Sequence, residues 1–521
     1  MIPTTVVIPT TRRASLERLL AALAHGRGPA PQWIVVVDDS PDGGGGVPLH
    51  RPALPPLTVH RSYGRGPAAA RNVGWRHARS AWVSFLDDDV VPDDDWFERL
   101  GADIADASLD IAGIQGRIRV PLPGQDAGFP RLEPASRADR PRTASVSSAD
   151  RRPTDSERNT AALADAAWIT ADMTYRRTVL AAVGGFDERF GRAYREDADL
   201  ALRVLEHGGR LVRGSRAVSH PPHHDDGWAS VRRQVGNADD VLMKRLHGRD
   251  WRERARAPRG RLRRHLAVTA AGLGAVGLAL AGRRRAAIAA ATVWAAGVAE
   301  FAAARIAPGP KTLPEVRQML LTSAVIPAAA SWHSVRGTWR HRRARPWRGL
   351  PEAVLFDRDG TLVHDVPYNS DPARVAPVPG VRQALDRLRQ AGVRVGVVTN
   401  QSGVARGLIS RTELDAVNGR VEFLLGPFDD WQMCVHGPDD GCACRKPEPG
   451  LVSRACVGLS VDPSRCVVVG DTGADIAAAR AAGAVGILVP NSVTLAEEVA
   501  AAPLVCDGVP SAVDRLIGGA W

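Results

Sequence analysis

The sequence predicts two α/β domains joined by a helical segment, and three observations support this prediction. Short strand-like runs alternate with helix-like segments before residue 240 and again after residue 351, a pattern typical of βαβ units and parallel sheets. In both regions some of these runs end in carboxylates, at the edge where open α/β sheets bind ligands. Two long apolar stretches lie between the two regions. We therefore expect domains at 1–240 and 351–521 and a helical linker at 241–350.

Composition limits the choice of partner and compartment. The formal net charge is +11, but only three of the 68 basic residues are lysines. This indicates a general bias towards arginine, and a nucleic-acid partner is not expected. All six cysteines lie between residues 434 and 506, so no disulfide framework spans the chain, which favours a cytoplasmic protein. A proline within the first apolar run, with no charged leader before it, argues against a signal peptide.

The first domain begins with a strand, a helix and a strand, at Thr5–Pro9, 15–25 and Trp33–Val37. A helix start at 66–74 and a further strand at Trp82–Leu86 follow. The second and third strands run into acidic clusters at 38–39 and 87–89. Hard cations such as Mg²⁺ and Mn²⁺ take oxygen ligands, and a diphosphate needs a cation to screen its charge.

This region resembles the family-two glycosyltransferases of the GT-A fold. The similar segments are VVIPT, VVVDDS, AAARNVG, FLDDDVVP, the stretch from Tyr175 to Glu188, and Glu196–Leu200. They follow the family's order over residues 5–220. The resemblance implies a nucleotide-sugar donor, a carbohydrate or lipid-linked acceptor, and direct, inverting displacement at the anomeric carbon.

The resemblance also implies roles for single residues of the first domain. Asp39, Arg71 and Asp87 would bind the nucleotide-sugar, and Asp89 with His220 would hold Mg²⁺ or Mn²⁺. Asp197 would be the general base, which must lie within hydrogen-bond reach of the acceptor hydroxyl. The stretch 121–160 is rich in Pro, Ser, Asp and Arg, so we expect a mobile loop there.

The linker carries two apolar stretches, Leu266–Gly282 and Ala286–Ala304, joined by three arginines. Their 17 and 19 residues lie near the lower limit of about 17–25 for a membrane span. Glu300 interrupts the second stretch, and Pro327 cuts a third apolar patch. A membrane surface at the inner face and a packed helical hairpin both remain open.

The second domain begins with a short strand, Val354–Phe356, that runs into Asp357-x-Asp359-Gly360. Taken alone this motif is weak, because Asp and Gly are common turn residues. A second strand ends in Thr399 and Asn400, and a later one in Gly470-Asp471. Four sequence signals, at strand ends or in loops, therefore follow one another along the chain. They are Asp357-x-Asp359, Thr399, Lys446 and Gly470-Asp471.

Phosphoryl transfer through a covalent aspartyl phosphate is the chemistry that this set can perform. Asp357 would attack phosphorus, and Asp359 would protonate the leaving oxygen and then activate water. Thr399, Asn400 and Lys446 would bind the phosphate. Asp357, Asp471 and the main-chain carbonyl of Asp359 would share one Mg²⁺, whereas Asp475 would steady the loop.

These residues are similar to those of the haloacid-dehalogenase phosphatases, which have a Rossmann-like fold. The similarity covers 353 to about 490 and is closer to the subgroup of heptose-bisphosphate and histidinol phosphatases. It implies a sugar phosphate substrate, heptose 1,7-bisphosphate first, and places Arg406 and Arg445 in substrate-facing loops. Thr472 departs from the lysine that heptose phosphatases commonly carry, which leaves the exact sugar open.

A second signal in this domain is Cys-x-His-x₅-Cys-x-Cys. Three sulfurs and one imidazole supply the four ligands of a closed, structural Zn²⁺ site, with free thiols or a disulfide as the alternative. The predicted zinc ligands are Cys434, His436, Cys442 and Cys444. The other three cysteines, Cys456, Cys466 and Cys506, have apolar neighbours and are expected in the core.

The sequence therefore predicts a bifunctional sugar enzyme, and two other interpretations remain open. In one, the phosphatase half acts on histidinol phosphate or on 3′ phosphate ends of nucleic acid. In the other, the transferase half is a non-catalytic docking module, which the intact acidic residues of the first domain argue against.

Overall fold

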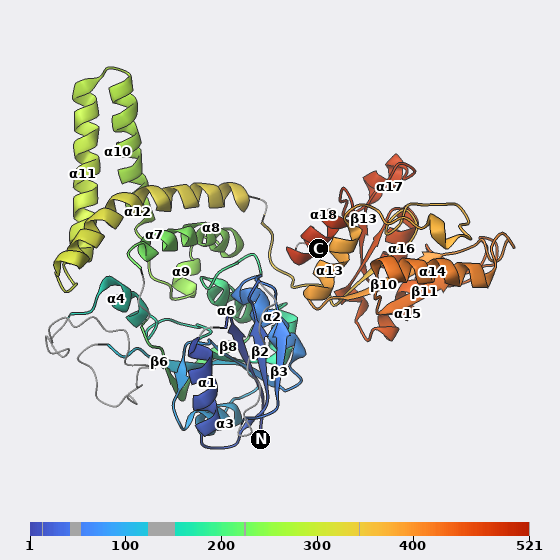
Figure 1. Cartoon of the computed structure of the whole chain (residues 1–521), viewed down its shortest axis with the longest axis horizontal. Coiled ribbons are helices and arrows are strands. Elements are labelled where there is room, and N and C mark those ends of the chain that lie inside the picture. Colours follow the sequence, from blue (N-terminus) through green and yellow to red (C-terminus); the bar gives the residue numbers. More distant parts are fainter. Residues whose placement is uncertain (13, 42–53, 123–151, 223–225, 343, 520) are drawn as a thin grey trace. The chain divides into compact units, whose positions relative to one another are not determined.

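The computed structural model describes residues 1–12, 14–41, 54–122, 152–222, 226–342, 344–519 and 521 (Figure 1). These residues form two compact units. Apart from two three-residue segments, the first unit comprises residues 1–345 and the second residues 346–521. The expected mixed α/β fold, with a helical region following the first sheet, is confirmed.

An eight-stranded sheet forms the centre of the first unit, in the order β3-β2-β1-β4-β7-β6-β8-β5. Strands β2, β1 and β4 are parallel neighbours, and β7 pairs with β4 in the antiparallel direction. The three strands predicted here are all present, as parts of β1, β2 and β4. The strands are β1 (Ile2–Thr10), β2 (Pro31–Asp38), β3 (Leu57–Arg61), β4 (Trp82–Leu86), β5 (Val91–Pro92), β6 (Ile111–Arg119), β7 (Asp172–Arg176) and β8 (Arg210–Ser219).

Helices cover both faces of this sheet, so its strands are apolar on both sides. Val6 and Ile8 of β1 pack on one face with α1 and α3, and Val7 packs on the other with α2, α5 and α6. The alternation follows from the two-residue period of a strand. The helices are α1 (Ala14–His25), α2 (Pro67–His77), α3 (Trp96–Ala105), α4 (Asp155–Ala161), α5 (Arg177–Ala182) and α6 (Glu196–Glu206).

Helix α4 corrects the prediction of a loop over 121–160, most of which lies outside the described residues. Thr154 caps the helix: its hydroxyl accepts from the Glu157 backbone N–H, and the Glu157 carboxylate accepts from the Thr154 N–H. Asp155 in the first turn also pairs with Arg305 at 3.0 Å. This reciprocal capping stabilises a short helix in a segment that composition alone assigns to a loop.

Six α-helices and a 3₁₀ turn (Arg233–Val235) follow β8 in the described part of the first unit, and the first of them pack on the sheet domain. Leu202 of α6 shares a core with Leu242, Met243 and Trp251, and the predicted boundary at residue 240 falls within α8. The helices are α7 (Ala229–Arg232), α8 (Gly236–His247), α9 (Trp251–Arg254), α10 (Leu262–Leu280), α11 (Arg284–Ile306) and α12 (Leu313–Arg340).

Pro327 does not end the helix that contains it, which corrects the expectation of a break there. Helix α12 continues through the proline. Ile326, Pro327 and Ala330 are buried, and the Ser331 hydroxyl donates to Thr269 of α10 at 3.0 Å. Packing against neighbouring helices therefore outweighs the loss of one helical hydrogen bond at the proline.

The second unit is a parallel five-stranded sheet in the order β11-β10-β9-β12-β13. Helices α13, α14 and α18 pack on one face, and α15 and α16 on the other. Its strands are β9 (Ala353–Phe356), β10 (Arg394–Asn400), β11 (Asp430–Cys434), β12 (Cys466–Gly470) and β13 (Val485–Leu488). Its helices are α13 (Val381–Gln390), α14 (Arg411–Leu425), α15 (Gly450–Gly458), α16 (Gly473–Ala481), α17 (Ala496–Ala501) and α18 (Val509–Ile517). Cys456, Cys466 and Cys506 are buried in these cores, as predicted.

Candidate functional sites

Three neighbouring strand ends form the candidate site of the second unit. The central strand β9 lies between β10 and β12, and all three are parallel. Asp357 follows β9, Thr399 lies at the end of β10, and Asp471 follows β12. Because parallel strands end at one edge of the sheet, the topology brings these three predicted residues together.

Lys446 lies at the centre of this group, in a loop far along the chain. Its Nζ donates to Asp357 Oδ1 at 2.5 Å, to Asp475 Oδ1 at 2.6 Å and to the carbonyl of Val398 at 2.9 Å. The side chain is almost completely buried. Asp357 and Asp475 raise the pKa of Lys446 despite its burial, so the amine is a fixed positive charge beside Asp357.

Carboxylates outnumber the single ammonium in this group. Ligand atoms of Asp357, Asp471 and Asp475 all lie within 4.8 Å of one another. Burial, followed by the neighbouring Asp475, raises the pKa of Asp471 to about 6. Burial also raises the pKa of Asp357, against the pull of Lys446. A divalent cation would offset this crowding, and one or two carboxylates with waters are the usual protein ligands of Mg²⁺.

The backbone beside Asp471 leaves no space for a side chain. Gly360 has φ +76°, and a Cβ there would lie 2.4 Å from Asp471 Oδ2. Asn491 Nδ2 donates to the same oxygen at 2.7 Å, and Thr361 Oγ1 donates to Oδ1 at 3.2 Å. Asp475 accepts from Lys446 and from Thr472, contacts that suit the predicted steadying role.

The side chain of Asp359 does not belong to this carboxylate group. Arg358 donates to it from Nε at 3.0 Å and from Nη2 at 2.7 Å, and Gln401 Nε2 donates at 2.7 Å. Arg358 is itself buried and also donates to Asn418 at 2.7 Å. Hydrogen bonds from two sides therefore fix the orientation of the Asp359 carboxylate. Neither Arg358 nor Gln401 was predicted from the sequence to have this role.

The predicted zinc ligands form one compact group. Five of the six distances joining Cys434 Sγ, His436 Nδ1, Cys442 Sγ and Cys444 Sγ run from 3.2 to 3.7 Å. Sulfurs at about 2.3 Å from a tetrahedral zinc would lie about 3.8 Å apart, and a nitrogen slightly closer. All six cysteines are free thiols, so the disulfide alternative is not observed. Burial alone would raise the pKa of Cys442. Hydrogen bonds from Cys444 and from backbone N–H groups have the larger, opposite effect, so the pKa is lowered to about 7.

The cysteine loop carries Arg445 and Lys446 directly after its last ligand. Asn400 fixes this loop to β10: its Nδ2 donates to the Lys446 carbonyl, and its Oδ1 accepts from the Lys446 N–H, both at 3.1 Å. Arg445 is half-buried and donates to the His436 carbonyl. Arg406 is exposed and donates to Tyr368 at 2.8 Å. Asn400 therefore positions Lys446, in addition to its predicted role at the phosphate.

A cavity of about 520 Å³ in the first unit collects the predicted donor-site residues. It lies at the ends of β1, β2 and β4 and reaches α6 and β8. Predicted residues that line it are Asp39, Arg71, Asp87, Asp89, Asp197 and His220. Asp39 Oδ2 accepts from the Gly66 N–H at 2.9 Å, before α2, and His220 Nε2 lies 3.5 Å from Asp89 Oδ1. The two residues predicted to hold a metal are thus neighbours.

Arg71 is buried beneath this cavity and joins two acidic elements. Its guanidinium donates to Asp87 at 2.7 Å and to Glu196 at 2.9 Å. Burial, reinforced by Asp197, raises the pKa of Glu196 to about 8, and burial also raises the pKa of Asp197. A raised pKa suits a carboxylate that must accept a proton near neutral pH. Through Arg71, Glu196 links the start of α6 to Asp87 at the end of β4, a role that was not predicted from the sequence.

Comparison with known proteins identifies a family for each of the two units. Residues 5–127 match the family glycosyl transferase family 2, and residues 369–483 match haloacid dehalogenase-like hydrolase. The D-glycero-beta-D-manno-heptose-1,7-bisphosphate 7-phosphatase of Pseudomonas aeruginosa is 36% identical over 172 residues, 32% of this chain and 97% of that protein. The chain belongs to the haloacid dehalogenase-like hydrolases.

Other relatives match the same part of the chain, the phosphatase domain. The enzyme of that name from Bordetella bronchiseptica is 41% identical over 135 residues, 25% of this chain and 75% of that protein. A crystal structure of D,D-heptose 1,7-bisphosphate phosphatase from B. bronchiseptica, complexed with magnesium and phosphate, is 35% identical, with a TM-score of 0.30. It covers 32% of this chain and 98% of that one. The amino-terminal domain is a family-two glycosyltransferase domain.

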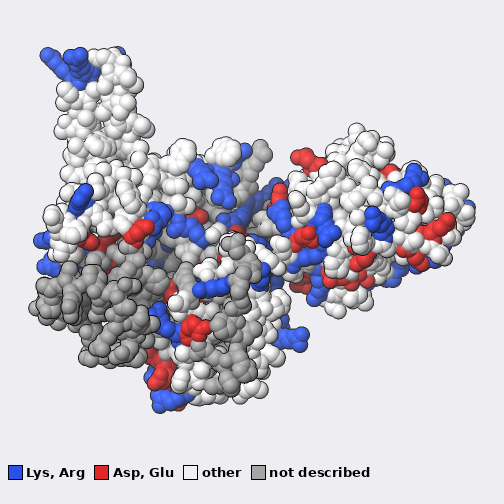
Figure 2. Space-filling model, viewed as in Figure 1, with Lys and Arg blue, Asp and Glu red and all other residues white. Residues whose placement is uncertain are grey.

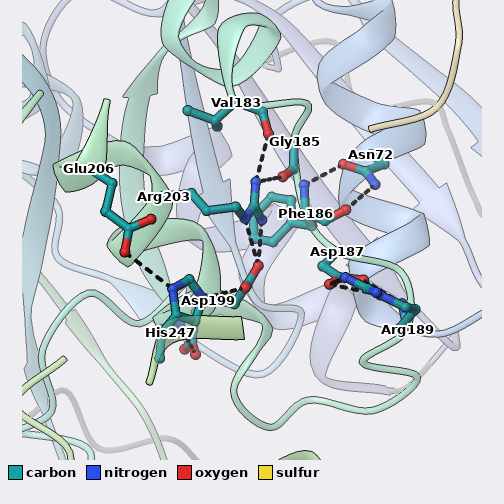
Figure 3. Close-up of polar contacts among 12 residues, drawn as sticks. Asn72, Val183, Gly185, Phe186, Asp187, Arg189, Asp199, Arg203, Glu206 and His247 are labelled. Carbon is teal, nitrogen blue, oxygen red and sulfur yellow. Dashed lines mark hydrogen bonds and ion pairs between the residues drawn. The ribbon is translucent and has the colours of Figure 1, made fainter. Parts of the chain in front are cut away.

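Figure 3 shows a polar network in the glycosyltransferase domain that was not predicted from the sequence. Asp199 is fully buried and pairs with Arg203 at 2.5 Å and with His247 of α8 at 2.8 Å. Arg203 Nη1 also donates to the carbonyls of Val183 and Gly185, both at 2.7 Å. Asp199, two positions after Asp197, therefore fixes α6 to its surroundings. The sequence signal that could have indicated this network is the mixture of acidic, basic and apolar residues in α6.

Proposed function

We propose that the phosphatase domain is a Mg²⁺-dependent enzyme that hydrolyses a sugar (bis)phosphate, with heptose 1,7-bisphosphate as its substrate. The observation that carries the proposal is Asp357 at the end of the central strand, in contact with Lys446 and flanked by Thr399 and Asp471. The names of the relatives that cover this domain support the choice of sugar.

Catalysis would begin with attack of a carboxylate oxygen of Asp357 on phosphorus. The new O–P bond forms as the ester P–O bond breaks, and Asp359 gives its proton to the leaving sugar oxygen. Asp359 then takes a proton from water, whose oxygen attacks phosphorus and releases Asp357 and inorganic phosphate. Lys446 and Thr399 balance the phosphoryl charge throughout. Mg²⁺ held by Asp357, Asp471 and the Asp359 carbonyl would supply charge neutralisation at the phosphate.

The experiment compares wild type and Asp357→Asn on heptose 1,7-bisphosphate, other sugar bisphosphates, histidinol phosphate and nucleotide 3′ phosphates, following phosphate release. Wild type should prefer heptose 1,7-bisphosphate, and the variant should release no phosphate from any of them. Preference for histidinol phosphate or for nucleotide ends would replace the proposed substrate. Residual activity in Asp357→Asn would contradict the proposed nucleophile.

We also propose that the four cysteine and histidine ligands hold a structural Zn²⁺. Their mutual distances and their position next to Lys446 support this role. The closed ligand set leaves no position for substrate. Metal analysis of the purified chain should find one zinc per chain, and the Cys442→Ser variant should contain much less. A zinc-free, fully active enzyme would contradict the proposal.

For the glycosyltransferase domain we propose inverting transfer from a nucleotide-sugar, with Asp197 as the base that deprotonates the acceptor hydroxyl. The cavity that gathers Asp39, Asp87, Asp89, His220 and Asp197 carries this proposal. Mg²⁺ or Mn²⁺ at Asp89 and His220 would screen the donor diphosphate. Release of nucleotide from a panel of nucleotide-sugars, with a lipid-linked or free carbohydrate acceptor, tests it. Donor binding without nucleotide release would favour the docking module instead.

A further inference from the structure

Away from its contact with α12, the hairpin formed by α10 and α11 exposes apolar side chains. Leu280 of α10 is 85% exposed, and Ile288 of α11 is 66% exposed. Within α10 only His265 is buried, and within α11 only Ala287 and Ala302. A helix that is apolar all round belongs in a protein core or in a membrane, and outside its contact with α12 this hairpin has no core around it.

The two helices touch one another along a seam of small residues. A Cβ at Gly272 would lie 2.9 Å from Trp294, and one at Gly297 would lie 2.4 Å from Val268. Glycine at these positions lets the backbones approach closely, as it does between helices packed in lipid. The seam accounts for the contact inside the hairpin but leaves the outer faces uncovered.

Charged residues mark both ends of the hairpin. Arg283, Arg284 and Arg285 form the tip. At the base, Glu300 accepts from Arg261 at 2.5 Å and from Arg264 at 3.1 Å. Figure 2 shows this arrangement as an uncharged column with basic side chains at its end. Glu300, which breaks the apolar run in the sequence, is therefore paired at the base of the column.

The length of the hairpin suits a bilayer. Helices of 19 and 23 residues extend about 28 and 35 Å at about 1.5 Å per residue, close to the hydrocarbon thickness of about 30 Å. Among the described helices, α11 alone meets the length and hydropathy expected of a span, with mean hydropathy 1.6 and 11% of its apolar window buried. That low burial excludes a core helix, and its place in mid-chain excludes a signal sequence.

We propose that α10 and α11 insert together into a lipid bilayer, with the tip arginines at one phosphate layer and the base arginines at the other. Anionic phosphates complement the arginines at both ends. A second copy of the chain would cover only one side of the hairpin, whereas lipid covers all sides. Such an anchor would hold the glycosyltransferase cavity at the lipid surface and so favour a lipid-linked acceptor, a consequence that rests on the proposed function.

The test mixes the full-length chain with vesicles of phosphatidylethanolamine and phosphatidylglycerol, followed by flotation and an alkaline carbonate wash. Wild type should float and stay with the lipid through the wash. The double variant Leu273→Asp/Ile288→Asp should lose more than about 100-fold of this partition, because each aspartate is strongly disfavoured in hydrocarbon. Leu109→Asp changes a leucine of the same unit that is 94% exposed and lies outside the hairpin, and this variant should float like wild type.

Three outcomes would overturn the inference. If wild type stays in the aqueous fraction, the chain has no bilayer anchor. If the carbonate wash releases wild type, the chain binds to the membrane surface without inserting. A lipid-free oligomer that the double variant converts to monomers would show that a second copy covers the hairpin. An unchanged circular-dichroism spectrum and an unchanged Tm show that the double variant is folded. None of these readouts depends on transferase activity, so failure of the anchor and failure of the proposed function are distinguishable.

Discussion

The two candidate sites lie at the ends of parallel strands but are assembled differently. In the phosphatase domain Asp357, Asp471 and Asp475 lie within 4.8 Å of one another, and the single side chain of Lys446 contacts Asp357, Asp475 and the backbone of β10. In the glycosyltransferase domain the corresponding groups surround a cavity of about 520 Å³ and are joined from beneath by Arg71. A single phosphoryl group needs a small, charged site, whereas a nucleotide-sugar and an acceptor need space for two ligands.

The largest expected effect is on the rate of glycosyl transfer at the cavity of the first unit. Asp197→Asn should lower glycosyl transfer by about 10²–10⁴-fold, the usual contribution of a general base, and should leave donor binding and phosphate release unchanged. Nucleotide release and calorimetric donor titration measure the two quantities. Transfer at the wild-type rate would mean that another group accepts the proton.

The neighbouring Asp199 provides a matched control for that variant, because it lies on the same helix but is fully buried. Asp199→Ala leaves Arg203 without its carboxylate partner, so we expect a loss of about 3–5 kcal/mol of stability. Thermal unfolding should show a clear fall in Tm for Asp199→Ala and little change for Asp197→Asn. If the two variants showed the same change in Tm, the assignment of Asp197 to catalysis and Asp199 to packing would be wrong.

On the phosphatase side, Lys446→Met should lower phosphate release by about 10²–10³-fold, the range found for removal of one preorganised charge-stabilising donor. Glycosyl transfer should not change. Lys244→Met removes an exposed lysine of α8 and should leave both activities at the wild-type level. Loss of both activities in Lys446→Met would show that the two sites are coupled.

Removal of zinc should have a smaller effect, confined to the phosphatase domain. A zinc-selective chelator in excess Mg²⁺ should lower phosphate release by about 10–100-fold, because the loop that carries Lys446 loses its support. Glycosyl transfer in the same sample is the internal control. Cys456→Ala, at a buried cysteine outside the ligand set, should keep its zinc and the same sensitivity to chelator.

The smallest expected change concerns the positioning of Asp359. Arg358→Lys removes the paired hydrogen bonds of the guanidinium, so we expect kcat to fall about tenfold while KM stays close to wild type. Steady-state kinetics on the preferred sugar phosphate separate these terms. Arg382→Lys alters an exposed ion pair and serves as the control. A rise in KM alone would assign Arg358 to substrate binding.

Much of each site follows from local sequence pattern, because carboxylates after buried strands meet at one edge of a parallel sheet. Asp357, Thr399 and Asp471 could therefore be placed together from the order of strands and polar residues along the chain. Arg358 and Gln401 could not, because their roles depend on which rotamer reaches Asp359. The same holds for the pair of Asp199 and His247, which are separated by 48 residues.

The fold also contains elements that the sequence predicts and elements that depend on tertiary contacts. Strands with a two-residue period and helices with clear ends were predictable, whereas α12 continues through Pro327 because neighbouring helices pack against it. Helix α4 depends on a reciprocal cap at Thr154 within a polar stretch. In both places tertiary or side-chain contacts outweigh local propensity.

The confinement of every cysteine to the phosphatase domain gives the two activities different chemical sensitivities. Thiolates that hold zinc are open to peroxide, and joining two of them as a disulfide would remove ligands and release the metal. The glycosyltransferase domain contains no cysteine. Oxidative stress is therefore expected to lower phosphatase activity before it affects glycosyl transfer.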